Sequence, residues 1–420
     1  MSIEFPAYRF CVRHRQRKEG LLRNLENQWR THFSRRFALR SLAGVLAGSP
    51  LLRAQVDPFR DHSRIPSLNE LLTAFDFEPA AFAHVPRDVY DFMMGSSDDE
   101  STFRRNRQVF DWVTLVPRGI ADVSSIDTSI ELFGQKMRFP ILVAPTSQQG
   151  PLHPEGEMGM HKGAAAANTT MIVSSAASNP IDRIAAASPG PLWFQLYRLD
   201  DIDSTLERMG RAEAAGCKVI AFTVDGPFGP YRERVLHDRH LSSTETGATP
   251  GDRSRTRQGT RINYGLGKGQ VFDWKLVDTL KAATKLPFLL KGLQTHEDAA
   301  IALEHGVDGI IVSNHGARRV GHGCATLEAL PEIVETVKDK IPVLIDSGFR
   351  RGSDVLKALA MGAKAVCLGR VPRWGLAGYG PVGVQRILEI VQSELVIAMA
   401  DTGQASIAAI DRNLVKVDFA

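Results

Sequence analysis

The chain has 420 residues, of which 43% are hydrophobic and 23% are charged, and its formal net charge is +4. Residues 1–54 contain 11 Lys or Arg against 3 acidic residues, so the remaining chain is net acidic, and it lacks the basic stripe expected for nucleic-acid binding. Four widely spaced cysteines and the lack of an uninterrupted apolar run of about 18 residues argue against a cysteine-based metal site, a disulfide scaffold and a conventional membrane-spanning helix. We therefore expect a soluble globular protein without a metal.

The N-terminal residues 34–55 read SRRFALRSLAGVLAGSPLLRAQ, a basic stretch followed by an apolar segment and a small residue. This order is typical of an export signal. Arg35 and Arg36 resemble a twin-arginine signal, although the usual pattern has one more residue before its Phe-Leu pair. The sequence predicts an export signal over residues 1–54 and a periplasmic enzyme. The alternative is an arginine pair in a basic disordered tail, and a misread start would leave the protein in the cytoplasm.

A helical segment over residues 55–112, mostly helical from Ser67 to about Arg107, precedes a repeated alternation of short apolar runs and helical patterns. The eight runs cover 139–147, 170–176, 192–197, 219–227, 287–292, 309–316, 342–348 and 365–370. Runs without polar alternation suit parallel strands covered on both faces. Eight of them predict an α/β protein whose residues 113–420 form a (β/α)8 TIM barrel.

Polar or glycine residues end every run, and the carboxyl ends of barrel strands build active sites. The side chains expected to converge there are Gln195, Tyr197, Thr223, Asp225, Lys291, His315, Asp346 and Arg370. Two consecutive ends repeat a glycine-plus-arginine arrangement, with Gly348 and Arg350 at one and Gly369 and Arg370 at the next. This repetition predicts a phosphate site between the last two strands.

Five segments in order resemble the FMN-dependent alpha-hydroxy-acid dehydrogenase and oxidase family over roughly residues 68–410: APTSQQGPLHPEGE, WFQLYRLDD, LLKGLQTHEDA, SNHGARR and DSGFRRGSDVLKALAMGAKAVCLGR. The resemblance implies FMN across the barrel mouth. Its phosphate would meet Gly348, Arg350, Gly369 and Arg370; its ribityl chain would meet Lys291 and Asp346; and its ring would lie near Pro145, Thr146, Ser174, Gln195 and Thr223. Lys291 also makes independent sense, because a cation beside the flavin N1 edge stabilises the charge of the reduced ring. A surface lysine is the alternative, which its position after an apolar run disfavours.

The oxidation of a 2-hydroxy acid requires a base, an anion clamp and an electron acceptor. His315 is the candidate base, Asp225 can hold its ring, and Arg318 can grip a carboxylate with two parallel hydrogen bonds. The resemblance adds Arg232 as a second arginine and Tyr197 as a hydrogen-bond partner of the substrate hydroxyl. A structural histidine and a helix-capping aspartate are the alternatives. The residues leave open whether a proton or a hydride departs first.

Three departures from the family pattern concern the substrate side. Phe92 stands where a tyrosine is usual, Ala176 stands where several members have tryptophan, and residues 319–321 read Arg-Val-Gly in place of Gln-Leu-Asp. We therefore expect a substrate bulkier than glycolate. Residues 237–268, rich in Gly, Ser, Thr and charge, predict a long mobile loop or lid after the fourth strand, which stays in water or docks an electron-acceptor protein.

These observations predict an exported FMN enzyme that oxidises a 2-hydroxy acid. One alternative is another FMN barrel chemistry, such as an isomerase or an oxidation of a non-acid or peptide-derived substrate, and another is a non-catalytic flavin-binding protein. The electron acceptor (oxygen, a quinone or a cytochrome) is left open. The resemblance implies a homo-oligomer, commonly a tetramer.

Overall fold

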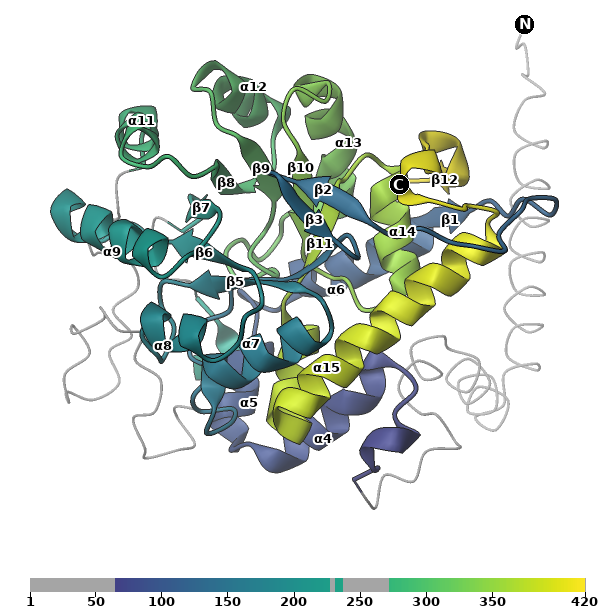
Figure 1. Cartoon of the computed structure of the whole chain (residues 1–420), viewed down its shortest axis with the longest axis horizontal. Helices are drawn as coiled ribbons and strands as arrows, with labels where there is room; N and C mark the ends of the chain where they lie inside the picture. The colour runs from purple at the N-terminus through teal and green to yellow at the C-terminus, as the bar shows by residue number, and fades with distance from the viewer. Residues whose placement is uncertain (1–64, 227–230, 237–271, 420) are drawn as a thin grey trace, which may run out of the picture. The chain divides into compact units, whose positions relative to one another are not determined.

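Eight parallel strands close into a barrel in the computed structural model, which describes residues 65–226, 231–236 and 272–419 (Figure 1). The strands are β4 (Ile141–Val143), β5 (Thr170–Ser174), β6 (Leu192–Leu196), β7 (Ile220–Thr223), β8 (Phe288–Leu293), β9 (Gly309–Val312), β10 (Val343–Asp346) and β11 (Ala365–Leu368). They pair in chain order, and β11 pairs with β4 to close the ring. The predicted TIM barrel is confirmed, since every strand coincides with one of the eight apolar runs.

The export signal predicted over residues 1–54 and the loop predicted over 237–268 lie outside the described residues. All the described residues belong to one unit, Ile65–Ala420. No helix in this described part of the chain is long and apolar enough to cross a membrane.

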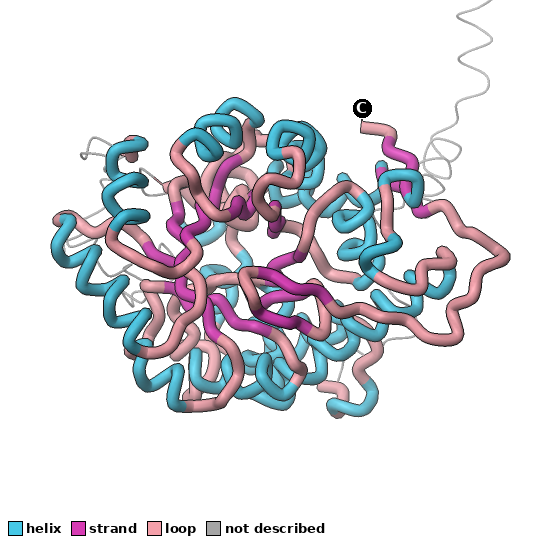
Figure 2. Tube along the Cα trace, turned by 45° about the horizontal axis from the view of Figure 1, so that its top comes forward, coloured by secondary structure: helices cyan, strands magenta, loops and turns pink. Residues whose placement is uncertain are grey.

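Helices surround the strands, which form the inner ring in Figure 2. They are α7 (Gly156–Ala166), α8 (Ile181–Ala186), α9 (Ile202–Ala214), α11 (Trp274–Ala282), α12 (His296–Glu304), α13 (Thr326–Val337), α14 (Gly352–Ala360) and α15 (Arg370–Asp401). Three of them begin at side chains that accept a backbone N–H three residues later, namely Asp201, Asp273 and Thr295. These caps satisfy donors that the first turn of a helix leaves unpaired.

The barrel interior is a packed core and not a channel. Trp193, Leu142 and Ile311 are among the strand residues that fill it. A hairpin of β2 (Ile130–Leu132) and β3 (Gln135–Met137) closes its amino end, where the Phe133 ring meets the Trp193 ring edge-on at 5.5 Å. The amino end is thus filled by side chains, which leaves the carboxyl end of the strands for chemistry.

The helical segment ahead of the barrel consists of α4 (Phe77–His84), α5 (Arg87–Met94) and α6 (Ser101–Gln108), with short 3-10 turns at Leu68–Glu70, Ala74–Asp76 and Val109–Trp112. Helix α15, yellow in Figure 1, packs against α4 and α7 and bends at Gly380, whose φ is 64°. After α6, β1 (Val113–Leu115) pairs with β12 (Val415–Val417) outside the barrel, and 3-10 turns at Ile407–Ala409 and Arg412–Leu414 precede β12.

Helices α5 and α6 contact the loop after β9. Arg318 Nη1 donates to the carbonyl oxygens of Phe92 at 2.9 Å and Gly95 at 2.6 Å, and the amides of Asn106 and Asn314 donate to each other at 3.0 and 2.9 Å. These contacts fix the N-terminal segment over the carboxyl end of the barrel. The segment therefore forms one wall of the candidate site.

Candidate active site

His315, at the carboxyl end of β9, lies between an acidic and a phenolic side chain. Its Nδ1 is 2.8 Å from Asp225 Oδ1, and its Nε2 is 3.1 Å from the Tyr197 hydroxyl. Because an ionised carboxylate only accepts hydrogen bonds, this arrangement assigns the ring proton to Nδ1 and a lone pair to Nε2. The nitrogen next to Tyr197 can therefore accept a proton.

The electrostatic surroundings keep the His315 imidazole neutral. Burial, reinforced by Arg319 and Lys291 and opposed by Asp225, lowers the pKa of His315 to about 4. Burial raises the pKa of Asp225, but the hydrogen-bonded His315 and the charges of Lys291 and Arg319 outweigh it and lower that pKa to about 2. At neutral pH the pair is therefore a neutral base oriented by a carboxylate, as general base catalysis requires.

The loop that presents His315 and Arg318 contains consecutive left-handed residues. His315, Gly316 and Ala317 have φ angles of 60°, 66° and 63°. Such angles cost free energy in residues other than glycine, so the surroundings must hold them. Ser313 Oγ accepts from the His315 backbone N–H at 3.0 Å, and Asn314 Oδ1 accepts from that of Ala317 at 2.9 Å.

Sequence reasoning missed Ser313, Asn314 and their distant partner Asn106. A signal was present at two of these positions, because Ser313 and Asn314 are polar residues directly after an apolar strand. Asn106 carried no such signal, since it lies 208 residues away from Asn314 in the chain.

Two guanidinium groups contact the ring of Phe92. The Arg318 Cζ atom lies 5.1 Å from the ring centroid, and the Arg232 Cζ atom lies 5.7 Å from it. Burial and then the nearby Arg232 and Arg370 hold the pKa of Arg318 well below its usual value. Among the described residues no group accepts a hydrogen bond from the buried Nε of Arg232. The two guanidiniums therefore form a region of excess positive charge, which the carboxylate of a substrate would neutralise.

These contacts bring the predicted substrate residues Phe92, Arg232 and Arg318 together. Tyr197 lies near both arginines, since it raises the pKa of each. Ala176 follows β5, where it is partly buried and its backbone N–H donates to Ser174 Oγ at 3.2 Å. It belongs to the same end of the barrel as the residues around Phe92.

Three of the residues predicted to lie near the flavin ring, Ser174, Gln195 and Thr223, form a hydrogen-bonded row along neighbouring strand ends. Gln195 accepts from Ser174 Oγ at 3.0 Å and donates to Thr223 Oγ1 at 2.8 Å. Thr146, which follows Pro145 at the end of β4, accepts from the Gln149 amide. The row therefore presents hydrogen-bond donors and acceptors that can pair with the polar edge of a heteroaromatic ring.

Lys291, which is in register with Thr223, lies in the same layer. Its Nζ donates to Ser313 Oγ at 2.7 Å and lies 3.1 Å from Asp346 Oδ2. Burial alone would lower the pKa of Lys291, but Asp346, Asp225 and Tyr197 raise it above its usual value. The ammonium is therefore a fixed buried charge, as a group that stabilises a reduced flavin must be.

Three buried guanidiniums form an anion pocket beyond this row. Arg350 stacks over the Trp374 ring at 4.9 Å, and Arg370 stacks over the Phe103 ring at 4.7 Å. Burial and then the neighbouring Arg350 and Arg373 lower the pKa of Arg370 to about 9. Among the described residues no acceptor meets the buried Nε atoms of Arg370 and Arg373. Adjacent buried cations with unmet donors fit a phosphate.

Arg373, which sequence reasoning missed, lies one turn after Arg370 on α15. Burial lowers its pKa to about 10, with Glu157 opposing. The sequence could have indicated Arg373, because it lies three residues after Arg370 and residues three apart share a helix face.

The two predicted phosphate glycines differ in what surrounds them. Gly348 has a φ of 91°, and a Cβ there would lie 2.0 Å from the Asn106 carbonyl oxygen. At Gly369 the nearest atom to an added Cβ would be 3.9 Å away, so its backbone faces open space. The open backbone at Gly369, the unmet arginine donors and the polar row together fit FMN.

Replacing Gly348 by alanine should destabilise the protein and weaken FMN retention, because the methyl group would clash with Asn106 at a left-handed position. The strain alone costs about 1–3 kcal/mol. Thermal unfolding and the flavin absorbance per protein after gel filtration measure both effects. Gly210→Ala is the matched control, because nothing lies within 4 Å of a Cβ on this glycine of α9. An unchanged melting temperature and flavin content in Gly348→Ala would contradict a required close contact between Gly348 and Asn106.

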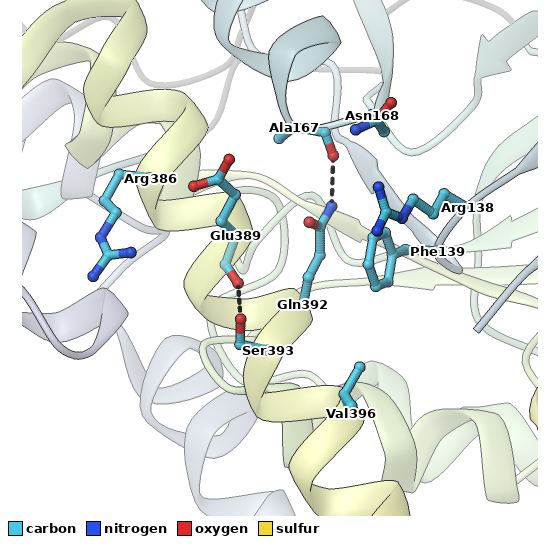
Figure 3. Close-up of a pocket in the computed structure, with 9 residues that line it drawn as sticks. All are labelled: Arg138, Phe139, Ala167, Asn168, Arg386, Glu389, Gln392, Ser393 and Val396. Carbon is cyan, nitrogen blue, oxygen red and sulfur yellow. Dashed lines mark hydrogen bonds between the residues drawn. The ribbon is translucent and has the colours of Figure 1, made fainter. Parts of the chain in front are cut away.

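A separate pocket of about 340 Å³ lies at the opposite end of the barrel strands (Figure 3). It is lined by Arg138, Phe139, Ala167, Asn168, Arg386, Glu389, Gln392, Ser393 and Val396. Phe139 precedes β4 and Asn168 precedes β5, so the pocket faces the amino ends of the strands. It lacks the base and the arginine cluster, and it is not the candidate active site.

The fold and site define a flavin-dependent barrel enzyme, in which a neutral histidine, a buried lysine and an arginine-lined anion pocket share one mouth. In the described part of the chain, no three His, Cys, Asp or Glu side chains gather as metal ligands do.

Comparison with known proteins agrees with this class. The family described as FMN-dependent dehydrogenase matches residues 81–417, and the chain belongs to that family. It is similar to glycolate oxidase 3 of Arabidopsis thaliana, with 38% identity over 83% of this chain and 97% of the relative. Glycolate oxidase of Spinacia oleracea is 37% identical over 83% of this chain and 97% of its own length. A crystal structure of mandelate oxidase superimposes with a TM-score of 0.76 at 36% identity, covering 83% of this chain and all of that one. The protein is therefore an FMN-dependent oxidoreductase.

Proposed function

We propose that the protein oxidises a 2-hydroxy acid to the 2-oxo acid. The observation that carries this proposal is the neutral His315, whose Nδ1 is fixed by Asp225 and whose Nε2 is next to Tyr197. Two half-buried arginines, Arg318 and Arg232, lie beside it. The relatives named as glycolate oxidases and the neighbouring structure named as mandelate oxidase support the same chemistry.

In this proposal the arginines hold the substrate carboxylate, and this orients the adjacent carbon and its hydroxyl toward His315. Tyr197 holds the hydroxyl oxygen, and Nε2 of His315 takes up the proton that is lost. Asp225 stabilises the resulting imidazolium. FMN, when bound, accepts the two electrons that leave the substrate. Lys291 and the Gln195 row would hold its ring, and Gly348, Arg350, Gly369 and Arg370 would hold its phosphate.

Anaerobic titration with a panel of 2-hydroxy acids tests the proposal, with bleaching of the flavin colour as the readout. Stoichiometric bleaching without an added nucleotide is expected. If no 2-hydroxy acid bleaches the flavin but turnover occurs with another donor, a different FMN chemistry replaces the proposal. Retained FMN without any turnover would indicate a non-catalytic flavin-binding protein.

We also propose that the substrate is bulkier than glycolate, because Phe92 provides an apolar wall under Arg318 and Arg232, and Ala176 is a smaller side chain than the tryptophan of several family members. We further propose that residues 34–55 direct export of the protein, which fractionation of cells tests. We also propose that the protein assembles into an oligomer, which light scattering of the purified protein tests. The electron acceptor can be identified by comparing turnover with oxygen, a quinone and a cytochrome.

Phe92→Tyr is expected to lower KM for small 2-hydroxy acids by about 10-fold or more. A hydroxyl near two guanidiniums adds a hydrogen bond to the carboxylate, and one such charge-assisted bond contributes about 1.5–3 kcal/mol. Steady-state kinetics with glycolate and with a larger acid measure the change. Phe82→Tyr, on a side chain that is 47% exposed on α4, is the control. A glycolate KM that stays constant in Phe92→Tyr would show that the missing hydroxyl does not restrict small substrates.

A further inference from the structure

A turn at residues 96–100 lies between the two backbone segments that carry Arg318 and Arg232. The Ser97 N–H donates to the carbonyl oxygen of the residue before Arg318 at 2.9 Å. The Asp98 N–H donates to the carbonyl oxygen of the residue before Arg232 at 3.0 Å. The turn is therefore bonded on one side to the loop after β9 and on the other side to the segment that carries the second arginine.

The Asp98 side chain packs against the β9 loop at Gly321, where the family motif has aspartate. A Cβ on Gly321 would lie 1.9 Å from Asp98 Oδ2 and 2.5 Å from Asp98 Cγ. Asp98 and Glu100 also have left-handed φ angles of 50° and 67°, which the surroundings must hold. The turn is thus fixed against the loop that carries Arg318.

Glu100 joins the segment 231–236 to this turn through a two-point ion pair. Arg234 Nε donates to Glu100 Oε1 at 2.9 Å, and Arg234 Nη2 donates to Glu100 Oε2 at 2.6 Å. Arg234 Nη1 lies 3.5 Å from Oδ1 of Asp91, whose side chain is fully buried. Burial disfavours the charge of Arg234, but Glu100 and Asp91 outweigh it and raise the pKa of Arg234. Because two parallel bonds fix direction as well as distance, the pair orients the segment.

Arg232 is a side chain that requires such an anchor, because its surroundings repel it. Burial and then the charge of Arg319 lower the pKa of Arg232 to about 10. Arg232 and Arg318 also face the same ring of Phe92. Arg234 lies two residues further along the segment, so its ion pair fixes the backbone from which the Arg232 side chain extends.

We infer that Arg234 is a positioning residue for substrate binding, whose ion pair with Glu100 places the Arg232 guanidinium beside that of Arg318 so that both meet one carboxylate. This inference rests on the proposed oxidation of a 2-hydroxy acid. Arg234 acts through Arg232, and His315 and Asp225 do not depend on it. Loss of the ion pair should therefore raise KM and change kcat little, since a carboxylate is held alike in the substrate and in the transition state.

Binding of 2-oxopentanoate to the oxidised, FMN-loaded enzyme tests the inference without turnover, with the flavin spectrum as the readout. We expect Arg234→Gln and Glu100→Gln each to raise Kd about tenfold, as for residues coupled through one network. Arg234→Lys keeps the charge but loses the fork, so its rise should be smaller, and it replaces Arg234→Gln if that variant does not fold. An unchanged Kd in these variants, or no saturable binding to the unaltered enzyme, overturns the inference.

Arg105→Gln is the matched control for the loss of a half-buried ion pair. Arg105 Nε and Nη2 donate to the two oxygens of Glu328, both at 2.7 Å, and its side chain is 43% exposed against 36% for Arg234. This pair joins α6 to α13 and does not involve the segment 231–236. Thermal unfolding should show a comparable loss of stability in both variants, but only Arg234→Gln should raise Kd. An equal rise in Kd in Arg105→Gln overturns the inference, because general loosening would then explain it.

The double variant Arg232→Gln with Arg234→Gln separates positioning from a direct effect of Arg234 on the ligand. If Arg234 acts through Arg232, Arg234→Gln should raise Kd no further in the Arg232→Gln background, whereas additive rises overturn the inference.

The Kd values also separate this inference from the proposed reaction. Coupled Kd values support the positioning role even if no 2-hydroxy acid bleaches the flavin. Where one does, a fall in kcat of Arg234→Gln without a rise in KM overturns the inference, even though the proposed reaction stands.

Discussion

Replacing His315 by alanine should slow flavin reduction by a 2-hydroxy acid by on the order of 10²–10⁴-fold, which is the usual contribution of a positioned base. The substitution removes Nε2 and leaves Asp225 and Tyr197 without their shared partner. FMN should remain bound, because the arginine pocket and the Gln195 row do not depend on the imidazole. Rapid mixing of the oxidised variant with substrate under anaerobic conditions measures the rate, and the flavin spectrum before mixing reports retention.

His296→Ala is the matched control for this experiment, since His296 is 52% exposed on α12 and pairs with two surface carboxylates, those of Glu297 and Glu332. Its rate should equal that of the unaltered enzyme. If the flavin of His315→Ala is reduced at a rate within about tenfold of that of the unaltered enzyme, His315 is not the base.

The pH dependence follows from the same residue. The proton is accepted by the neutral imidazole, so activity is lost as His315 becomes protonated. Because burial lowers its pKa from 6.5 to about 4, kcat/KM should stay level as the pH falls below 6.5 and decline only near pH 4. Circular dichroism over the same range separates this decline from unfolding. A decline centred at pH 6.5 would mean that the base is solvated or is a different residue.

Arg318→Leu should lower kcat/KM by on the order of 10²–10⁴-fold. The substitution removes a fork of two charge-assisted hydrogen bonds to the carboxylate, each of which contributes about 1.5–3 kcal/mol. Some loss of stability is also expected, because Arg318 donates to the carbonyl oxygens of Phe92 and Gly95. Steady-state kinetics measure the first effect, and thermal unfolding measures the second.

Arg318→Lys separates charge from geometry at this position. Lysine keeps the positive charge but lacks the planar fork, so its loss should be smaller than that of leucine. If Arg318→Leu folds, retains FMN and keeps the kcat/KM of the unaltered enzyme, then Arg318 is a structural link between α5 and the β9 loop and not a carboxylate ligand.

The sequence by itself determined the barrel and the end of it that carries chemistry. Runs such as residues 309–316 are apolar without alternation, which is how a parallel strand buried on both faces must read, and β9 forms within that run. Polar residues after each run then had to meet at one mouth, because parallel strands end on the same side. The grouping of His315 with Lys291 and Arg370 follows from this rule, whereas their catalytic and binding roles stay predictions.

Only the tertiary structure decided how these side chains meet. The Tyr197 contact with His315 joins residues 118 apart in the chain, and Asn106 supports the loop from 208 residues away. Periodicity and motif spacing report on neighbours along the chain, so they contain no distance between such residues. The close approach of Gly226 to the Arg319 guanidinium has the same cause. It depends on the ends of β7 and β9, which are not neighbours in the sheet and which only the closed barrel brings near each other.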